Sequence, residues 1–192
     1  MKRGLEYKKI FQALNFFAIS ETGRINKLKA LKLIWLADRL HLRKYGRTIT
    51  GDVYWALPHG PVPSNAKNFA EDSQFAEDVE KEYGYQYIRK IDTFNYESIK
   101  PVDSKVFSKS DITVLQEIYN AFGNLGQYTL RDLSHEYPEW LRFESALKMK
   151  RSSRYLIEMS DFFKNCDSNP EIFNQPDELL EVSKEDYFAI AL

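Results

Sequence analysis

Residues 26–46 read NKLKALKLIWLADRLHLRKYG, and this stretch predicts a long helix around which the rest of the chain can pack. Asn26 is a favourable N-cap, because its side-chain oxygen can accept a hydrogen bond from a backbone N–H of the first turn. Gly46 is suited to the left-handed conformation that often ends a helix. The middle of the stretch, 33–37, is apolar on every side, so we expect the helix to pass through the core as a central strut.

Four basic residues follow one side of this predicted helix. At 100° per residue their side chains fall within an arc of about 80°, and they are Lys29, Lys32, Arg39 and Arg43. The stripe has three interpretations: a solvated polar face, a docking face for an acidic protein partner, or a contact for a phosphate backbone. The aromatic residues that stack on single-stranded bases are not on this stripe, because Trp35 belongs to the apolar run.

The segments around this stretch predict further helices and a small sheet. Apolar residues spaced by three and four predict a helix over 5–20. Residues 53–57 are typical of a short strand, and 83–88 with 94–99 predict a hairpin, so together they would make one small antiparallel sheet. Further helices are expected over 110–122, 129–137, 138–149 and 153–166. The predicted fold class is therefore α+β: a mostly helical domain with a small antiparallel β-sheet inserted between its N-terminal and C-terminal helices.

Length and charge are consistent with one domain followed by an acidic end. A chain of 192 residues can bury a core without disulfides, and we predict a single domain over residues 1–166. Residues 167–192 hold seven acidic residues and one lysine, and we predict that they form an acidic C-terminal extension. Residues 1–50 hold 12 Lys and Arg against 3 Asp and Glu, so this basic region is expected first of all to meet the acidic part of its own chain.

The residues that carry most enzyme and metal chemistry are sparse. The three histidines lie far apart and match no metal-binding spacing, so neither a metal nor a cofactor is expected. Ser64 lies near His59, but an N-cap role for a short helix explains it without catalysis. Cys166 is the single cysteine, which favours a reducing compartment and a cytoplasmic location, and no apolar run approaches the ~18 residues of a membrane span. We therefore expect no catalytic residue and no enzyme; a small hydrolase using His59 or Cys166 is the remaining catalytic alternative.

A second candidate binding feature is residues 54–63, which read YWALPHGPVP. Aromatic residues beside a rigid Pro/Gly turn can form a preorganised partner site, since little conformational entropy is left to lose on binding. The candidate contacts there are Tyr54, Trp55, His59, Gly60 and Pro61. The same residues can equally form a core strand and a structural turn.

Residues 29–38, KALKLIWLAD, resemble the K-L-x-K-L-x-Y-x-A signature of the Panacea domain of SocA-like antitoxins. Further matching residues follow in the expected order, and they are Gly46-Arg47, Asp52, Ala56 and Gly60-Pro61-Val62. Ala30 and Trp35 stand where Leu and Tyr are usual. The resemblance covers about residues 8–70 of the chain.

The resemblance implies a non-catalytic antitoxin of bacteria or their phages, which neutralises a cognate toxin by direct protein–protein binding. The toxin would be the partner, a protease or chaperone is an additional candidate, and neither nucleic acid nor a membrane is expected. The alternative function is a DNA-binding regulator that uses the basic helix over 27–45, because phosphate contacts by Lys and Arg give salt-dependent affinity.

Overall fold

The computed structural model describes residues 5–71, 73–166 and 170–189. Its α-helices are α1 (Tyr7–Ser20), α2 (Lys27–Tyr45), α3 (Ser64–Ala70), α4 (Asp78–Gly84), α5 (Lys109–Phe122), α6 (Gln127–Ser134), α7 (Pro138–Leu141), α8 (Glu144–Lys148) and α9 (Asp177–Ala189). Its strands are β1 (Arg24–Asn26), β2 (Tyr54–Leu57), β3 (Gly60–Pro63), β4 (Ile88–Lys90), β5 (Asn95–Ser98) and β6 (Tyr155–Leu156). Short 3-10 helices span Ser104–Val106, Met159–Phe163 and Glu171–Phe173. The prediction of a mostly helical α+β fold is confirmed.

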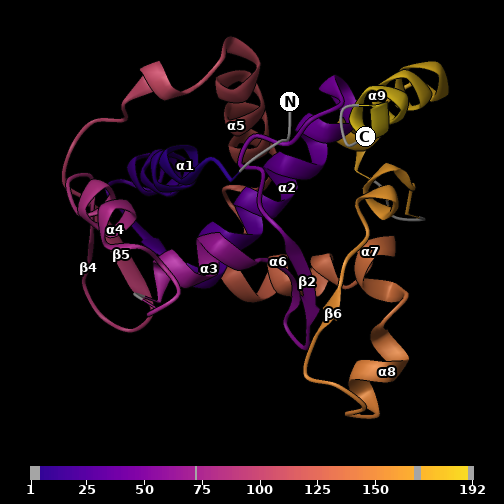
Figure 1. Ribbon diagram of the computed structural model, residues 1–192, viewed down its shortest axis with the longest axis horizontal. Helices are drawn as coiled ribbons and strands as arrows, with labels where there is room; N and C mark the ends of the chain where they lie inside the picture. The colour runs from indigo at the N-terminus through magenta and orange to yellow at the C-terminus, as the bar shows by residue number, and fades with distance from the viewer. Residues whose placement is uncertain (1–4, 72, 167–169, 190–192) are drawn as a thin grey trace.

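Helix α2 is the central element, as its sequence predicts. In Figure 1 it crosses the middle of the molecule, with α1, α5, α6 and α9 arranged around it. The Asn26 side chain accepts from the N–H of Leu28 at 2.9 Å, and Gly46 ends the helix with a φ of 60°. Every residue from 29 to 43 is buried, so α2 has no solvent-facing side along most of its length.

The sheet prediction is right in kind but wrong in its pairing and in one strand: residues 83–87 form the end of α4 and a turn, and β4 begins only at Ile88. Within the described residues the strands form two antiparallel three-stranded sheets, in the orders β3-β2-β6 and β1-β5-β4. The hairpin β4-β5 therefore pairs with β1, while β2 pairs with β3 across a two-residue turn, with Trp55 opposite Val62. A turn this short keeps the entropy cost of closing the hairpin low, which favours the local partner β3 over the distant strands.

The helices expected over 138–149 and 153–166 are also corrected. The first is divided into α7 and α8, and the second is replaced by β6 and the 3-10 helix Met159–Phe163. Strand β6 lies along the open edge of β2, where the N–H of Ile157 donates to the carbonyl of Tyr54 at 2.9 Å. This partner lies about 100 positions away in the sequence, so helical spacing within 153–166 carried no information about it.

One hydrophobic core extends through the described residues and continues beyond residue 166. Phe173 is fully buried, and its ring packs against the rings of Phe122 and Tyr137. Helix α9 lies on α2 through Leu180 and Ser183, both of which are buried. Residues on both sides of the expected boundary at residue 166 therefore contribute to the same core.

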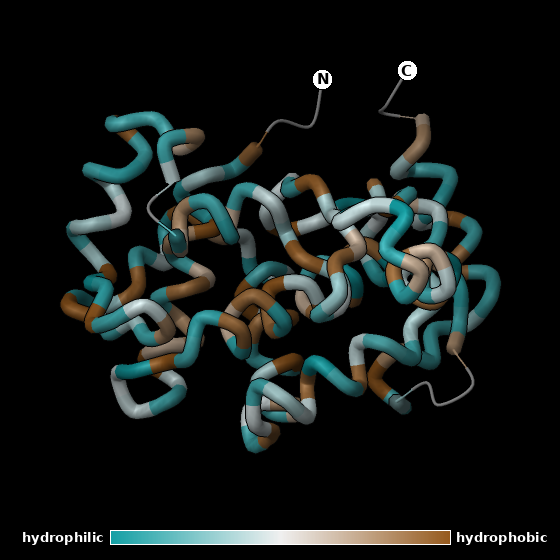
Figure 2. The backbone as a smooth tube through the Cα atoms, turned by 90° about the horizontal axis from the view of Figure 1, so that it is seen from below, coloured by the Kyte–Doolittle hydropathy of each residue, from teal (hydrophilic) through white to brown (hydrophobic). Residues whose placement is uncertain are grey.

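The hydropathy pattern follows this packing. In Figure 2 brown hydrophobic segments recur at short intervals along the tube and alternate with teal hydrophilic ones, as expected for helices that each bury one face. Among the described residues no helix has both the length and the apolar character that crossing a membrane requires.

Candidate functional site

The predicted basic stripe on α2 lies inside the molecule. Lys29 is 7% exposed, and Lys32, Arg39 and Arg43 have no exposed surface. The prediction of a stripe that faces solvent or a partner is wrong, because α2 is covered on all sides and its cations are covered with it. Lys29 instead pairs with Glu21 and donates to the carbonyl of Gly123, each at 2.5 Å.

Lys32 shows how deep this burial goes. Its ammonium donates to the carbonyl of Pro61 at 2.9 Å, which connects α2 to β3. Burial, followed by the charge of Arg131, lowers the pKa of Lys32 well below its usual value. Lys32 therefore holds the strand β3 in place from the interior.

The two arginines have partners that lie far away in the sequence. Arg39 Nε donates to Glu139 Oε1 on α7 at 3.1 Å, and both side chains are fully buried. Burial and the neighbouring charge of Arg39 lower the pKa of Arg43 to about 10. The Arg43 guanidinium binds the C-terminal segment through the carbonyls of Phe162, Phe163, Lys164 and Phe173 and the side chains of Asn165 and Gln175. A DNA backbone cannot reach these buried cations, so the stripe of Lys29, Lys32, Arg39 and Arg43 offers no DNA-binding surface.

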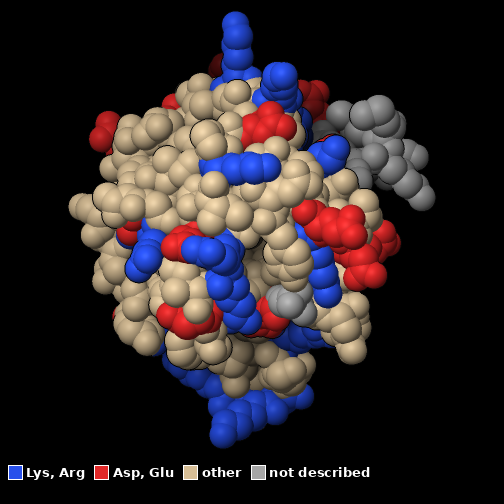
Figure 3. Space-filling model, turned by 90° about the vertical axis from the view of Figure 1, so that its left-hand side faces the viewer, with Lys and Arg blue, Asp and Glu red and all other residues tan. Residues whose placement is uncertain are grey.

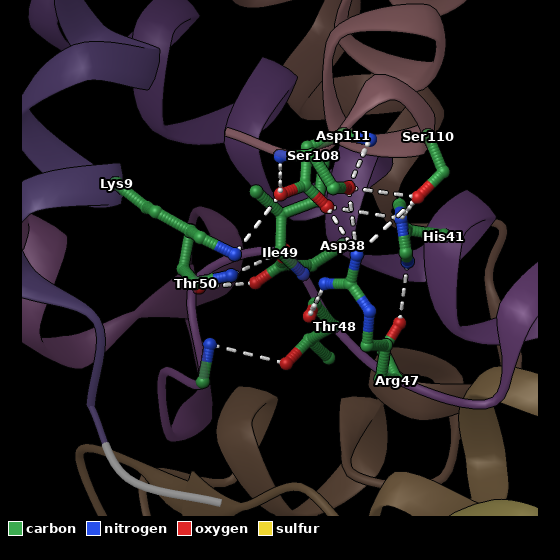
Figure 4. Close-up of polar contacts among 11 residues, drawn as sticks. Lys9, Asp38, His41, Arg47, Thr48, Ile49, Thr50, Ser108, Ser110 and Asp111 are labelled. Atoms are coloured by element: carbon green, nitrogen blue, oxygen red, sulfur yellow. Dashed lines mark hydrogen bonds and ion pairs between the residues drawn. The ribbon is translucent and has the colours of Figure 1, made fainter. Parts of the chain in front are cut away.

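A polar network joins α1, α2, the loop 47–50 and the start of α5, as Figure 4 shows. At its centre Asp111 receives Lys9 Nζ at 2.9 Å and Arg47 Nη2 at 2.7 Å, and His41 Nε2 lies 3.1 Å from Oδ1. The N–H of Ser108 also donates to Asp111, which completes a capping box for α5. Burial raises the pKa of Asp111, but the hydrogen bonds from His41, Ser108, Lys9 and Arg47 outweigh it and hold that pKa well below its usual range.

Asp38 forms the second half of this network and fixes the path into β2. Its carboxylate accepts from the N–H of Ile49 at 2.7 Å, from the N–H and hydroxyl of Thr50, and from the Tyr54 hydroxyl at 2.6 Å. Burial raises the pKa of Asp38, and these hydrogen bonds oppose the rise. Tyr54, a candidate partner contact, is thus buried and bonded inside the protein. Each of these carboxylates has several donors, so the network has a structural role in positioning β2.

Asp52 supplies the helix cap that the sequence assigned to Ser64. Its two carboxylate oxygens accept from the N–H groups of Asn65 and Ala66, at 2.9 and 2.8 Å. Ser64 is instead the first residue of α3, and the N-cap position is Pro63. The described residues also contain no group of three or more His, Cys, Asp or Glu side chains that could hold a metal ion.

A surface hollow lies beside the turn of the β2-β3 hairpin, and we call it the hairpin groove. Its volume is about 640 Å³. Its wall is mostly apolar and is formed by Leu28, Leu31, Leu57, Pro58, Val62, Phe94 and Tyr128, together with the polar residues Asn26, Lys27, His59, Lys67, Glu71, Asn95 and Gln127. Phe94 is 63% exposed and Tyr128 is 62% exposed, so two aromatic side chains from distant parts of the chain present accessible surface at the hollow.

The charges of the hairpin groove are partly neutralised within it. Glu71 receives Lys67 Nζ at 2.6 Å and Lys27 Nζ at 3.2 Å. Two lysines thus share one carboxylate, which leaves this rim with an excess of positive charge. Figure 3, which shows the left-hand side of the molecule in Figure 1, likewise shows basic and acidic side chains next to one another with wide uncharged areas between them.

The structure separates the hairpin residues that the sequence grouped together. His59 is exposed in the β2-β3 turn, and Trp55 is half-buried, with the Arg154 guanidinium 4.5 Å from the centre of its ring. Gly60 and Pro61 are buried, and a Cβ on Gly60 would overlap Ser134 Oγ and Lys32 Nζ. Of the candidate contacts, His59 and Trp55 are therefore the ones that a partner can reach on this surface.

Phe94 and Tyr128 were missed by the sequence analysis. Each follows a turn signal, Asp92-Thr93 in one case and Gly126 in the other, which is the only indication that they leave the core. Their proximity to the β2-β3 turn depends on the pairing of β5 with β1 and on the packing of α6 beside β3.

Comparisons with known proteins give one match. A family model described as the SocA-like antitoxin, Panacea domain, matches residues 31–141, which is more than half of the chain. The matched range contains β2, β3, Phe94 and Tyr128, and it ends with α7. Neither the curated proteins nor the solved structures gave a match.

Proposed function

Because the chain belongs to the family of SocA-like antitoxins with a Panacea domain, we propose that it neutralises a cognate toxin by direct, stoichiometric protein contact and without catalysing a reaction. The pair would act in the cytoplasm of a bacterium or of a cell infected by its phage, where a chain with a single cysteine suits the reducing conditions. A protease or chaperone would at most act on the complex after it has formed.

The observation that carries this proposal is the hairpin groove. All of its lining residues except 26–28 fall within the family-matched range 31–141. It combines an apolar hollow with the exposed aromatic rings of Phe94 and Tyr128. Aromatic anchors beside a central hollow are the usual source of binding energy at protein interfaces. The turn that carries His59 is held by buried contacts of Gly60 and Lys32. Because the turn is already ordered, it loses little conformational entropy when a partner binds. We therefore assign the toxin contact to the hairpin groove.

The mode of action is tested by titration. A neighbouring gene whose product is toxic alone supplies the toxin, and purified antitoxin is added to a fixed amount of it. Stoichiometric binding predicts that residual toxin activity falls linearly and reaches zero at a fixed molar ratio near one antitoxin site per toxin. Complete loss of toxin activity at a hundredfold deficit of antitoxin would show catalysis and would reject the proposal.

The site is tested by the double substitution Phe94→Ala with Tyr128→Ala. Both rings are more than half exposed, so the fold should persist, while the affinity for the toxin should fall at least about 30-fold, as expected for two interface anchors. Phe188→Ala, on α9 and 41% exposed, is the matched control and should bind like the wild type. Equal affinities for the double variant and the control, measured by calorimetry, would remove the hairpin groove as the contact.

A further inference from the structure

The loop between α8 and β6 presents a group of exposed cations. Lys150, Arg151 and Arg154 are exposed, and none of them forms an ion pair with a described residue. Lys150 has a φ of 54°, which marks a tight left-handed turn at the tip of the loop. Met149 and Leu156 beside them are 64% and 52% exposed. We call the surface formed by Met149, Lys150, Arg151, Arg154, Leu156 and the half-buried Trp55 the basic patch.

Helix α9 presents a surface of the opposite charge. Leu180 and Ser183 face α2 and are buried, so Glu178, Val182 and Glu185, at spacings of four and three, lie on the outer side of the helix. Leu179 is 38% exposed and Val182 is 55% exposed. We call the surface formed by Glu178, Leu179, Val182 and Glu185 the acidic stripe.

These two surfaces complement each other but cannot meet within one molecule. Figure 1 shows α9 at the top right and α8 at the bottom right, with α7 and β6 between them. Each surface combines charges of one sign with exposed apolar side chains, Met149 and Leu156 in one case and Leu179 and Val182 in the other. A nucleic acid would satisfy the cations but would place phosphates against Met149 and Leu156, so an acidic and apolar helix fits the basic patch better.

We propose that the basic patch binds the acidic stripe of a second copy of this chain. In Figure 1 the elements that carry the two surfaces, the loop after α8 and helix α9, lie at the lower and upper ends of the right-hand side of the molecule, so a two-fold axis between them can bring each acidic stripe onto the basic patch of the other copy. Such a dimer is closed and makes the same contact twice. Because exposed ion pairs supply part of the attraction, the dimer is weak and dissociates as salt is added.

The test is the sedimentation of the full chain at several protein and salt concentrations. The wild type should be dimeric at high concentration in low salt, and its dissociation constant should rise at least about tenfold when the Debye length is shortened from about 14 to 4 Å. Lys150→Glu with Arg151→Glu should be monomeric, and Glu178→Lys with Glu185→Lys should be monomeric too. An equal mixture of the two variants should restore the dimer, since each altered surface then meets an altered partner of opposite charge.

The matched control is Lys105→Glu with Lys109→Glu. Both lysines are exposed at the approach to α5, and this variant has the same net charge as the patch variant. It should dimerise like the wild type. A monomeric wild type in low salt, equal dissociation of the control, or failure of the mixture to reassociate would each overturn the proposal. If the wild type is monomeric and the patch variant loses toxin neutralisation while circular dichroism shows it folded, the basic patch belongs to the toxin interface and self-association is rejected.

Discussion

Asp111 shows how much of the architecture one carboxylate can hold together. It lies in the first turn of α5 and binds Lys9 from α1, Arg47 from the loop after α2, and the N–H of its own N-cap Ser108. Its partners lie in three different segments, so the loss of its charge would weaken contacts throughout the interface of α1, α2 and α5 (Figure 4). Because its pKa in the folded protein is lowered, the stabilisation is fully present above the unfolded pKa of about 3.9 and is lost as the pH falls below it.

We predict that Asp111→Asn lowers the free energy of unfolding by about 3 kcal/mol at pH 7, because Lys9, Arg47 and His41 lose a charged partner. The variant should also lose less stability than the wild type between about pH 4.5 and pH 2.5, since it has no carboxylate to protonate there. Urea denaturation at several pH values measures both effects. Asp132→Asn, an exposed carboxylate paired with Arg131, is the control and should change stability by less than about 0.5 kcal/mol. An unaltered acid slope in Asp111→Asn would contradict this account.

The direction of the α2 cations could not be predicted from local sequence. The prediction that Lys29, Lys32, Arg39 and Arg43 share one side of α2 was correct. Whether that side is exposed to solvent depends on which other elements pack against the helix. The acid that pairs with Arg39 is Glu139, and the carbonyl that receives Lys32 is that of Pro61, so both partners exist only in the folded chain. The apolar run 33–37 was the available signal, because a helix that is apolar all round is covered all round.

At the level of elements, the β2-β3 hairpin depends on Gly60, which is packed tightly against buried side chains. Gly60 has a φ of 94°, and the place that a Cβ would take is already filled by Ser134 and Lys32. Gly23 has a similar φ of 99° but has no atom within 4 Å of the same position. Comparing substitutions at the two glycines therefore distinguishes the cost of backbone strain, which both share, from the cost of steric overlap, which occurs only at Gly60.

We predict that Gly60→Ala costs at least about 2 kcal/mol more stability than Gly23→Ala, because both variants carry the strain of a positive φ but only the first must push Lys32 and Ser134 aside. Thermal unfolding of the two variants beside the wild type measures the difference. Equal losses would mean that α6 and Lys32 can move freely away from the turn.

Elements with local signals were predictable, and those fixed by distant partners were not. The ends of α2 followed from Asn26 and Gly46, whose capping roles involve only their own neighbours. Strand β6 was predicted as helix because its apolar residues have helical spacing, while its true partner is Trp55. The hairpin groove was predictable to the extent of His59 and the rigid turn, whereas Phe94 and Tyr128 required the tertiary fold.

At the scale of the whole molecule, the C-terminal part is joined to the family-matched part by Arg43. Its guanidinium donates hydrogen bonds to three consecutive carbonyls, at residues 162–164, and to the carbonyl of Phe173. The same segment carries the buried Phe173 and leads into α9. One side chain of α2 therefore sets the path of residues 159–166 and 170–176.

We predict that Arg43→Met frees this segment more than the rest of the chain, because its carbonyls lose their donors while α1 and α5 keep theirs. Hydrogen exchange followed by mass spectrometry should show exchange at least about tenfold faster in residues 159–166 and 170–189 than in α1, relative to the wild type. Arg89→Met is the control, since its partner Glu97 is on an exposed strand pair. A uniform increase in exchange over all helices would instead indicate general destabilisation.

Strand β3 is an outer strand of its sheet, and two of its four residues, Pro61 and Pro63, have no amide hydrogen. At this edge of the sheet a foreign polypeptide therefore cannot add a continuous ladder of backbone hydrogen bonds, which is the step that starts many aggregates and fibrils. A protein that binds beside the hairpin turn must then be recognised by the shape and charge of its side chains. These differ between proteins, whereas backbone hydrogen-bonding groups, which all proteins share, cannot form such a ladder with β3.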